Sequence, residues 1–339
     1  MGHGALHPLW FAAILAVSRC SDALSMDALV RRFRNGAAPV RRSSSYALPL
    51  RFMWLLLGII YFFPGFWKIW DNGVDWFTSN QIVHLMHSLW HRNLELSPIP
   101  GFRLDYYPAL AGLSALATVV FELGFLLLLF SPRTRVLAAA LALLFHRALA
   151  YFIRIGFPFL QAVLPILIDW DKLFRKIGIL PPQSPEPEPK LSLGKDKLVV
   201  VVGGLLLLGN LLAGVCGQES GWPFSSYPTF RHASTPLDRS LAVKVVFDDD
   251  TSEILRDKEL KVEGQSSLLF RLLRHYALAE NPRIEPIRKM LSYTAAAHPN
   301  FQRARSATVM IETVYADPDK WEDAPVSQDI LFEMDLERR

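Results

Sequence analysis

The sequence predicts an all-α polytopic membrane bundle with about six hydrophobic segments, followed by a small C-terminal α+β extracytoplasmic domain. The 339 residues are 51% hydrophobic and have a mean hydropathy of +0.21, which is too apolar for an ordinary soluble domain. The apolar residues gather in runs that are long enough to cross a bilayer. Residues 217–339 instead show short alternating stretches, which are typical of half-buried strands.

The first apolar segment, Leu9–Val17, has the length of a signal-peptide core or a truncated span. A signal peptide is disfavoured because the basic residues follow this run instead of preceding it. The second segment is Leu48–Phe66, which we expect to break at Pro64-Gly65. The remaining predicted segments are Tyr106–Phe130, Val136–Phe152, Ile155–Ile168 and Leu198–Val215.

These segments predict four consecutive parts of the chain. They are a membrane core over 1–176, a Pro-rich cytoplasmic linker over 177–197, a last transmembrane helix over 198–216, and the outer domain over 217–339. The linker contains the stretch PPQSPEPEP, in which the prolines disfavour a helix.

Basic residues gather in alternate loops, and positively charged loops stay on the cytoplasmic side. This pattern predicts that Lys68 and the C-terminal domain lie on the outer side of the membrane, which we expect to be a bacterial inner (plasma) membrane. The formal charge of +4 does not indicate a nucleic-acid partner, because the basic residues flank the spans. They are Arg31, Arg32, Arg34, Arg41, Arg42, Arg51, Arg133, Arg135, Lys172, Arg175, Lys176, Lys190, Lys195 and Lys197.

Residues 77–93 form an amphipathic pattern that predicts a helix lying in the membrane interface. His84, His87 and His91 fall on one face of this helix. Two of them could share a metal ion, but no HExxH-type acid accompanies them, so we expect a polar helix face and no metal. Cys20 and Cys216 lack metal-ligand spacing and do not predict a disulfide framework.

The C-terminal region predicts strands at 241–247, 306–315 and 328–336 and helices at 266–280 and 286–298. The stretch DDDT after the first strand predicts a turn. This region contains no nucleophile elbow, Gly-rich phosphate loop or Cys/His metal cluster.

Lys68 is the first candidate for chemistry, because it stands among aromatic residues at the edge of an apolar span. One interpretation is an interfacial anchor, since Lys and Trp commonly lie together at headgroup level. The other is a base, because a desolvated Lys gives up its proton more easily and can take one from a substrate.

Glu122, His146 and Arg147 lie inside predicted spans. Ionisable groups at membrane depth are costly unless they face one another or a wet cavity. A structural Glu–Arg pair that fixes helix packing and a functional site are both open interpretations.

The stretches YFFPGFWKIWDNGVDW, FELG, FHRA and FPFLQAVLPILIDW occur in an order and spacing similar to the HTTM (horizontally transferred transmembrane) family. That family includes the vitamin K-dependent gamma-carboxylases and bacterial membrane proteins. The resemblance covers about residues 20–175, and WPFSSYPTF (222–230) resembles a motif of the bacterial members.

The resemblance implies that Lys68 is the base that deprotonates a reduced, vitamin K-like quinone, and that His146 matches the family's Phe-His step. Trp67 stands where the carboxylase has the first Lys of a Lys pair, and Pro64 replaces a small residue. Compared with the family, the chain starts within a later span, so one or two N-terminal helices are expected to be absent or lost through start-site choice. The outer domain is also expected to lack the carboxylase's propeptide-binding region.

Two functions therefore remain open. The first is an HTTM-like enzyme, carboxylase-like or a quinone-dependent lyase or oxygenase, that acts on a quinone or another lipid-soluble substrate. It would use Lys68 as the base, Glu122 and His146 as supporting groups, Trp67 and Arg147 as cofactor contacts, and no metal. The second is a non-catalytic, membrane-anchored binding or assembly protein. In both cases the lipid bilayer is the expected partner.

Overall fold

The structure is a computed structural model, and it describes residues 6–18, 30, 33–34, 46–93, 99–178, 196–218, 224, 230, 234–256, 259–260, 267–279 and 281–336. The chain divides into two compact units. A helical unit contains Met1–Ile82 and Phe102–Ala233, and a sheet unit contains Val83–Gly101 and Ser234–Arg339. Most of the predicted Pro-rich linker, most of the basic N-terminal loop and Cys20 lie outside the described residues.

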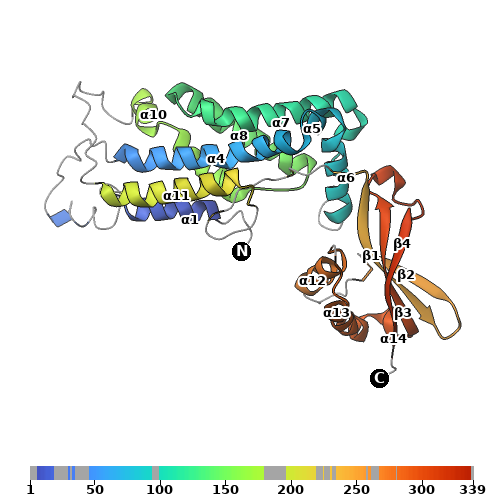
Figure 1. Ribbon diagram of the computed structural model, residues 1–339. Coiled ribbons are helices and arrows are strands. Elements are labelled where there is room, and N and C mark those ends of the chain that lie inside the picture. The colour runs from blue at the N-terminus through green and yellow to red at the C-terminus, as the bar shows by residue number, and fades with distance from the viewer. Residues whose placement is uncertain are drawn as a thin grey trace. The chain divides into compact units, whose positions relative to one another are not determined.

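Four helices among the described residues are long and apolar enough to cross a membrane. Helices α4 and α7 pack along each other, and α11 packs against α4 (Figure 1). The four helices are α4 (Ala47–Asn72), α7 (Pro108–Leu128), α8 (Pro132–Phe152) and α11 (Lys197–Val215).

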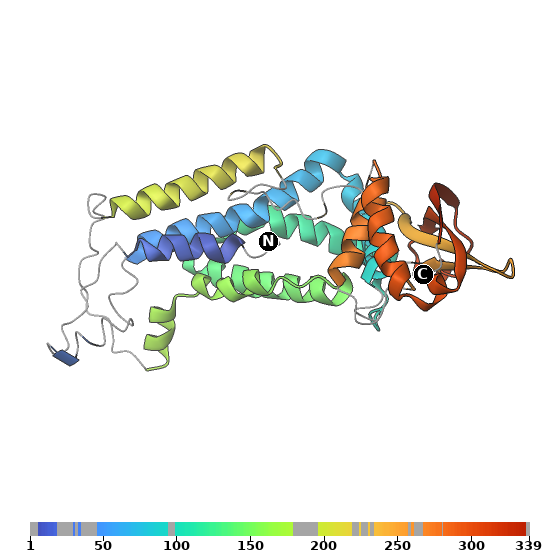
Figure 2. The same ribbon diagram turned by 90° about the horizontal axis from the view of Figure 1, so that it is seen from below.

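Two of the six predicted segments form shorter helices. Leu9–Val17 corresponds to α1 (Leu6–Ala16), which packs against α4 and α11 and lies alongside α4 in Figure 2. Ile155–Ile168 corresponds to α9 (Pro158–Val163) and the 3-10 turn η4 (Leu164–Leu167) instead of one continuous helix. Pro158 is the first residue of α9 and Pro165 is the second residue of η4, because proline is favoured in a first turn and interrupts a helix interior.

The predicted break at Pro64-Gly65 is wrong, because α4 continues through both residues to Asn72. Pro64 removes one helical N–H donor, but packing on both sides holds the helix together. Tyr61, Pro64, Gly65 and Lys68 are all buried in α4, and their spacing of three and four residues places them on one face. Lys68 therefore belongs to the helix that begins at Ala47.

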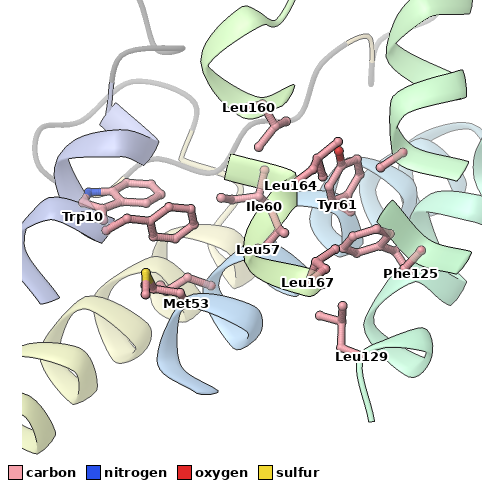
Figure 3. Packing of buried hydrophobic residues seen from close by; sticks show 14 of the residues in the cluster. Trp10, Met53, Leu57, Ile60, Tyr61, Phe125, Leu129, Leu160, Leu164 and Leu167 are labelled. Carbon is pink, nitrogen blue, oxygen red and sulfur yellow. The ribbon is translucent and has the colours of Figure 1, made fainter. Parts of the chain in front are cut away.

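The helical unit has one main apolar core, which Figure 3 shows from close by. Trp10 of α1 packs there with Met53 and Leu57 of α4, and Phe125 of α7 lies beside Tyr61. Leu160, Leu164 and Leu167 bring α9 and η4 into the same core. These two short pieces therefore fill the interior of the bundle. The unit also contains α5 (Asp75–Thr78), η3 (Leu104–Tyr106) and α10 (Trp170–Lys176).

The sheet unit is an antiparallel sheet in the order β2-β1-β3-β4. The three predicted strands and the two predicted helices are confirmed, with ends shifted by a few residues. The turn at DDDT is also confirmed, and the strand after it, β2, was not predicted. The elements are β1 (Leu237–Phe247), β2 (Ser252–Arg256), β3 (Ala304–Tyr315), β4 (Ser327–Asp335), α12 (Ser267–Ala277), α13 (Ile284–Ala297), α14 (Pro299–Gln302) and η5 (Pro318–Lys320).

The core of the sheet unit forms between the sheet and helices α12 and α13. Leu241 and Val243 of β1 pack with Leu273 of α12 and with Ile287 and Leu291 of α13. Side chains on successive strand residues point to opposite faces. The alternation that predicted these strands therefore marks the face that the helices cover.

The predicted interfacial helix over 77–93 divides into α5 and α6 (Gln81–Asn93). Asn80, between them, has a left-handed backbone with φ 57°, a conformation that Asn tolerates better than most residues. From Val83 onward, α6 belongs to the sheet unit. Its polar face therefore has protein partners in the sheet unit, which the sequence did not predict.

Candidate functional site

Lys68 and Glu122 form a buried ion pair between α4 and α7. The Lys68 Nζ lies 2.6 Å from both the Oε1 and the Oε2 of Glu122. Lys68 is only 2% exposed and Glu122 only 5%. Two opposite charges withdrawn from water are stabilised only when they are close and well hydrogen-bonded, and this pair meets both conditions.

Lys68 and Glu122 each belong to a narrow row of buried residues along one face of their helix. In α7 the buried residues include Ala111, Ala115, Val119 and Glu122, which recur every three or four residues. The small residues allow α4 to approach closely, and a Cβ added at Gly65 would lie 2.8 Å from the Cβ of Glu122. This close approach of the two backbones lets the Lys68 side chain reach Glu122.

Aromatic and polar groups enclose the Lys68 end of the pair. The ring centroid of Trp76, on α5, lies 5.1 Å from the Lys68 Nζ, which is within cation–π range. The Trp76 Nε1 donates to the Phe230 carbonyl at 3.1 Å. The last residue of the WPFSSYPTF stretch therefore helps to hold the ring beside Lys68; apart from Phe224 and Phe230, this stretch lies outside the described residues.

A second buried polar pair joins α4 to α8. The Tyr61 hydroxyl lies 2.6 Å from the Nε2 of His146, and both residues are buried. The Nδ1 of His146 is also buried and has no hydrogen-bond partner among the described residues. In α8 the buried positions Ala138, Ala142 and His146 recur every four residues. His146 therefore lies on the same face of α8 as the alanines that pack into the bundle.

The two polar pairs share the buried face of α4. Tyr61 lies seven residues, or about two helical turns, before Lys68. Phe121 and Phe125, on the same helix as Glu122, pack against the Tyr61 ring with centroid distances of 5.4 and 4.1 Å. An amine, a carboxylate, a phenol and an imidazole are thus held in one aromatic interior, and all four can donate or accept protons.

The other two predicted site residues lie elsewhere. The Trp67 Nε1 donates to the Gly214 carbonyl at 2.8 Å, so this indole connects α4 to α11. Arg147 is exposed on α8, and the ion pair of Glu122 is with Lys68 in place of the Glu–Arg pair that was one interpretation. The structure therefore brings together Lys68 and Glu122, adds the pair of Tyr61 with His146, and leaves Trp67 and Arg147 outside.

Two histidines of α6, His84 and His91, take part in a polar cluster of the sheet unit. The Nδ1 of His84 lies 3.2 Å from the Ser234 carbonyl, and the Nδ1 of His91 lies 3.3 Å from Asp238 of β1. Arg92 contacts the same carboxylate, with its Nη2 2.6 Å from the Oδ1 of Asp238. Within the described ranges, no group of three or more His, Cys, Asp or Glu side chains is arranged to hold a metal ion.

These contacts determine the charge of Asp238. Burial alone opposes ionisation, but the hydrogen bonds from His91 and Arg92 and the nearby positive charge outweigh it. Together they hold the pKa of the Asp238 carboxyl well below its usual range. Asp238 is therefore a permanent anion at neutral pH and fixes Arg92.

Sequence reasoning missed Tyr61 and Asp238. The signal for Tyr61 was its spacing of seven residues from Lys68, which places both on one helix face. Asp238 had no comparable signal, because its partner Arg92 lies 146 residues earlier in the chain. Searches of protein-family models, curated proteins and solved structures found no match to this chain.

Proposed function

We propose that the helical unit is a membrane-embedded, HTTM-like enzyme core that transfers protons to and from a lipid-soluble substrate with an acidic hydroxyl, such as a reduced quinone. The observation that carries this proposal is the burial of the Lys68–Glu122 pair inside helices long enough to span a membrane. An ionisable pair at that depth is a functional candidate by default.

The pair supplies a route for one proton. The Lys68 Nζ lies 2.6 Å from each carboxylate oxygen of Glu122, so a proton of the ammonium group can pass directly to the carboxylate. When this proton passes to Glu122, Lys68 becomes a neutral amine that can accept the proton of a substrate hydroxyl. Glu122 then holds the first proton, and the ion pair is restored when Glu122 gives this proton to an oxygen of the departing product.

The surroundings of the pair suit a planar aromatic substrate. Trp76 covers Lys68, and a quinone ring could occupy a similar stacking position once Trp76 moves aside. Tyr61 and His146 form the neighbouring hydrogen-bonding pair, which could orient a second substrate oxygen. In this proposal the core lies in a bacterial inner membrane, with the sheet unit on its outer side.

A non-catalytic function is the second candidate, and the tight packing of Lys68 favours it. With 2% of its surface exposed and both carboxylate oxygens in contact, Lys68 could serve only to fix α4 against α7. The helical unit would then anchor the sheet unit as a binding or assembly module.

A quinone-binding titration on the full chain in nanodiscs separates the two candidates. A reduced naphthoquinone is titrated against wild type, Lys68→Met and the control Lys197→Met, which changes an exposed lysine at the start of α11. The enzyme proposal predicts saturable binding to wild type and to Lys197→Met, and its loss in Lys68→Met. Oxygen uptake that depends on Lys68 would extend the result to catalysis.

The opposite result would identify an anchor. If folded wild-type protein binds no reduced quinone, or if Lys68→Met binds as wild type does, the Lys68–Glu122 pair is structural and the proposed chemistry is wrong.

A further inference from the structure

Two arginines lie near each other at the starts of two membrane-length helices. Arg51 is in the second turn of α4 and Arg135 is in the first turn of α8, and the charge of Arg51 acts on Arg135. Helix α10 lies at the same end of the helical unit as the start of α4 (Figure 1). Arg51 precedes Lys68 by 17 residues, or about 26 Å along the helix, so the proposed proton transfer does not use this end.

Arg135 is held in place by an aromatic ring. Its guanidinium carbon lies 3.7 Å from the ring centroid of Trp54, which is within cation–π range. The Trp54 Nε1 donates to the Ile166 carbonyl at 2.9 Å, and this hydrogen bond fixes the ring. The Nε of Arg135 is buried and has no hydrogen-bond partner among the described residues. The protein therefore orients this guanidinium without satisfying its donors.

The nearby carboxylate does not balance these arginines. Asp169 is the acidic residue whose charge acts on Arg135, but its Oδ1 accepts the backbone N–H of Lys172 and caps α10. In the part of the chain that the structure describes, neither Arg51 nor Arg135 forms an ion pair. Arg133 is exposed two residues before Arg135 and adds a further positive charge. Like charges repel at short range, and an anion between Arg51 and Arg135 would relieve that repulsion.

Exposed apolar side chains follow these arginines along the helices. Leu55 lies four residues after Arg51, and Leu137 lies four residues after Arg133, and both leucines are exposed. A spacing of four residues places each leucine on the same helix face as its arginine, one turn further along. Cations at the helix start, followed by apolar side chains one turn deeper, match the order of phosphate and acyl chain in a phospholipid.

We propose that Arg51 and Arg135 bind the phosphate of one anionic phospholipid, such as phosphatidylglycerol, whose acyl chains lie against the exposed leucines. This inference rests on the membrane embedding in the proposed function, but not on the chemistry of Lys68. Two guanidinium forks match the oxygens of a phosphate, and basic sites between spanning helices on the cytoplasmic side hold anionic headgroups. The bound phosphate joins α4 to α8.

Native mass spectrometry of the full chain in detergent tests this site, with phosphatidylglycerol and phosphatidylcholine of equal chain length as the probes. Wild type should bind phosphatidylglycerol at least about tenfold more tightly, the effect of a charge-assisted hydrogen bond to its phosphate. Arg135→Gln and Arg51→Gln should each remove most of this preference. Arg51→Gln is the safer variant for folding, because Arg51 is exposed and the contact of Arg135 with Trp54 stays intact.

Lys197→Gln is the matched control. Lys197 is exposed at the start of α11, on the same predicted cytoplasmic side. Its replacement removes the same charge outside the Arg51–Arg135 pair and should change the affinity by less than about twofold, the effect expected of a screened charge. The variant Lys68→Met/Glu122→Leu should keep the full preference, so a failure of the quinone proposal leaves this one standing.

Three results would overturn the lipid site. The first is a wild-type protein that binds phosphatidylglycerol no more tightly than phosphatidylcholine, and the second is a loss in Lys197→Gln as large as the loss in Arg51→Gln. The third is equally tight binding of glycerol phosphate, the soluble part of the headgroup. That result would identify a soluble phosphate as the ligand, because the acyl chains would then contribute nothing.

Discussion

The effect of substitutions at the Lys68–Glu122 ion pair on protein stability should depend on whether one partner or both are replaced. Removing one partner leaves a charge in an apolar interior, which typically costs about 3–5 kcal/mol, whereas replacing both with apolar side chains is often nearly neutral. The pair spans α4 and α7 with almost no solvent exposure. It should therefore follow this rule.

We accordingly expect Lys68→Met to destabilise the protein by about 3–5 kcal/mol, and the double variant Lys68→Met/Glu122→Leu to recover most of that loss. Thermal unfolding in nanodiscs measures both, with Lys197→Met as a control for an exposed lysine. Strictly additive effects of the two single substitutions would contradict a direct coupling. The double variant is also informative about function, because a stable protein without quinone binding separates the chemical role of the pair from its structural one.

Asp238 should make stability depend on pH in the acid range. Its pKa is lowered in the folded protein, so its ionised form stabilises the fold above the unfolded-state value of about 3.9. That stabilisation is lost as the pH falls through the folded pKa.

We expect Asp238→Asn to lower the stability of the full chain by about 1–2 kcal/mol at neutral pH, since Arg92 is half-exposed and can turn to water. The difference from wild type should shrink steadily below about pH 4. Unfolding midpoints recorded across this pH range test the prediction. A difference that stays constant down to the lowest pH would show that the carboxylate charge is not what stabilises the fold.

At the scale of helices, the contact between α4 and α7 depends on Gly65. A Cβ at this position would lie 2.8 Å from the Cβ of Glu122 and 3.2 Å from the backbone nitrogen of Leu123, which is closer than side chains normally approach. Gly65 therefore allows α4 and α7 to pack closely enough for the Lys68 side chain to contact Glu122.

Gly65→Ala should destabilise the protein by about 1–3 kcal/mol through overpacking, despite the higher helix propensity of Ala. Gly124→Ala provides the control, because its Cβ would meet nothing within 4 Å, and it should be neutral or slightly stabilising. Unfolding midpoints compare the two variants in the same lipid. Equal effects would mean that α4 and α7 are free to separate and that Gly65 has no special role.

The elements that the sequence predicted are those with a strong local pattern. Apolar runs identified α4, α7, α8 and α11, and alternation identified β1, β3 and β4. Sequence reasoning failed where tertiary packing overrides a local signal. Pro64 suggested a break, but buried contacts carry the helix through it, and β2 is too short and too exposed to show a pattern.

Part of the candidate site was also predictable from a local pattern in the sequence. Lys68, Glu122 and His146 stand out because ionisable residues are unusual in apolar runs. Their partners depend on which helix faces meet, and this is a property of the assembled bundle. Tyr61 was therefore not recognised, and the structural interpretation of Glu122 paired it with an arginine, whereas its partner is Lys68.

At the scale of the whole molecule, the chain combines a helical unit with membrane-length helices and a sheet unit with a conventional covered sheet. The outward-facing residues of the long helices are largely apolar, among them Leu113, Leu144 and Leu205. Large apolar side chains exposed in this number mark a surface that meets lipid or another protein. Membrane insertion with a defined orientation is the consequence that can be tested most directly.

The distribution of basic loops predicts that α11 ends on the outer side of the membrane, and Cys216 stands exposed at that end. In a Cys20→Ser background, Cys216 is the one remaining cysteine of the chain. We expect a membrane-impermeant maleimide to label it in intact spheroplasts. The matched control carries Lys172→Cys in α10, with both native cysteines replaced by Ser. Position 172 is exposed and belongs to a predicted cytoplasmic loop, so this cysteine should be labelled only after permeabilisation. The reverse labelling pattern would show that the topology is opposite to the predicted one. Both α4 and α11 would then end on the cytoplasmic side, and so would Lys68 and the sheet unit.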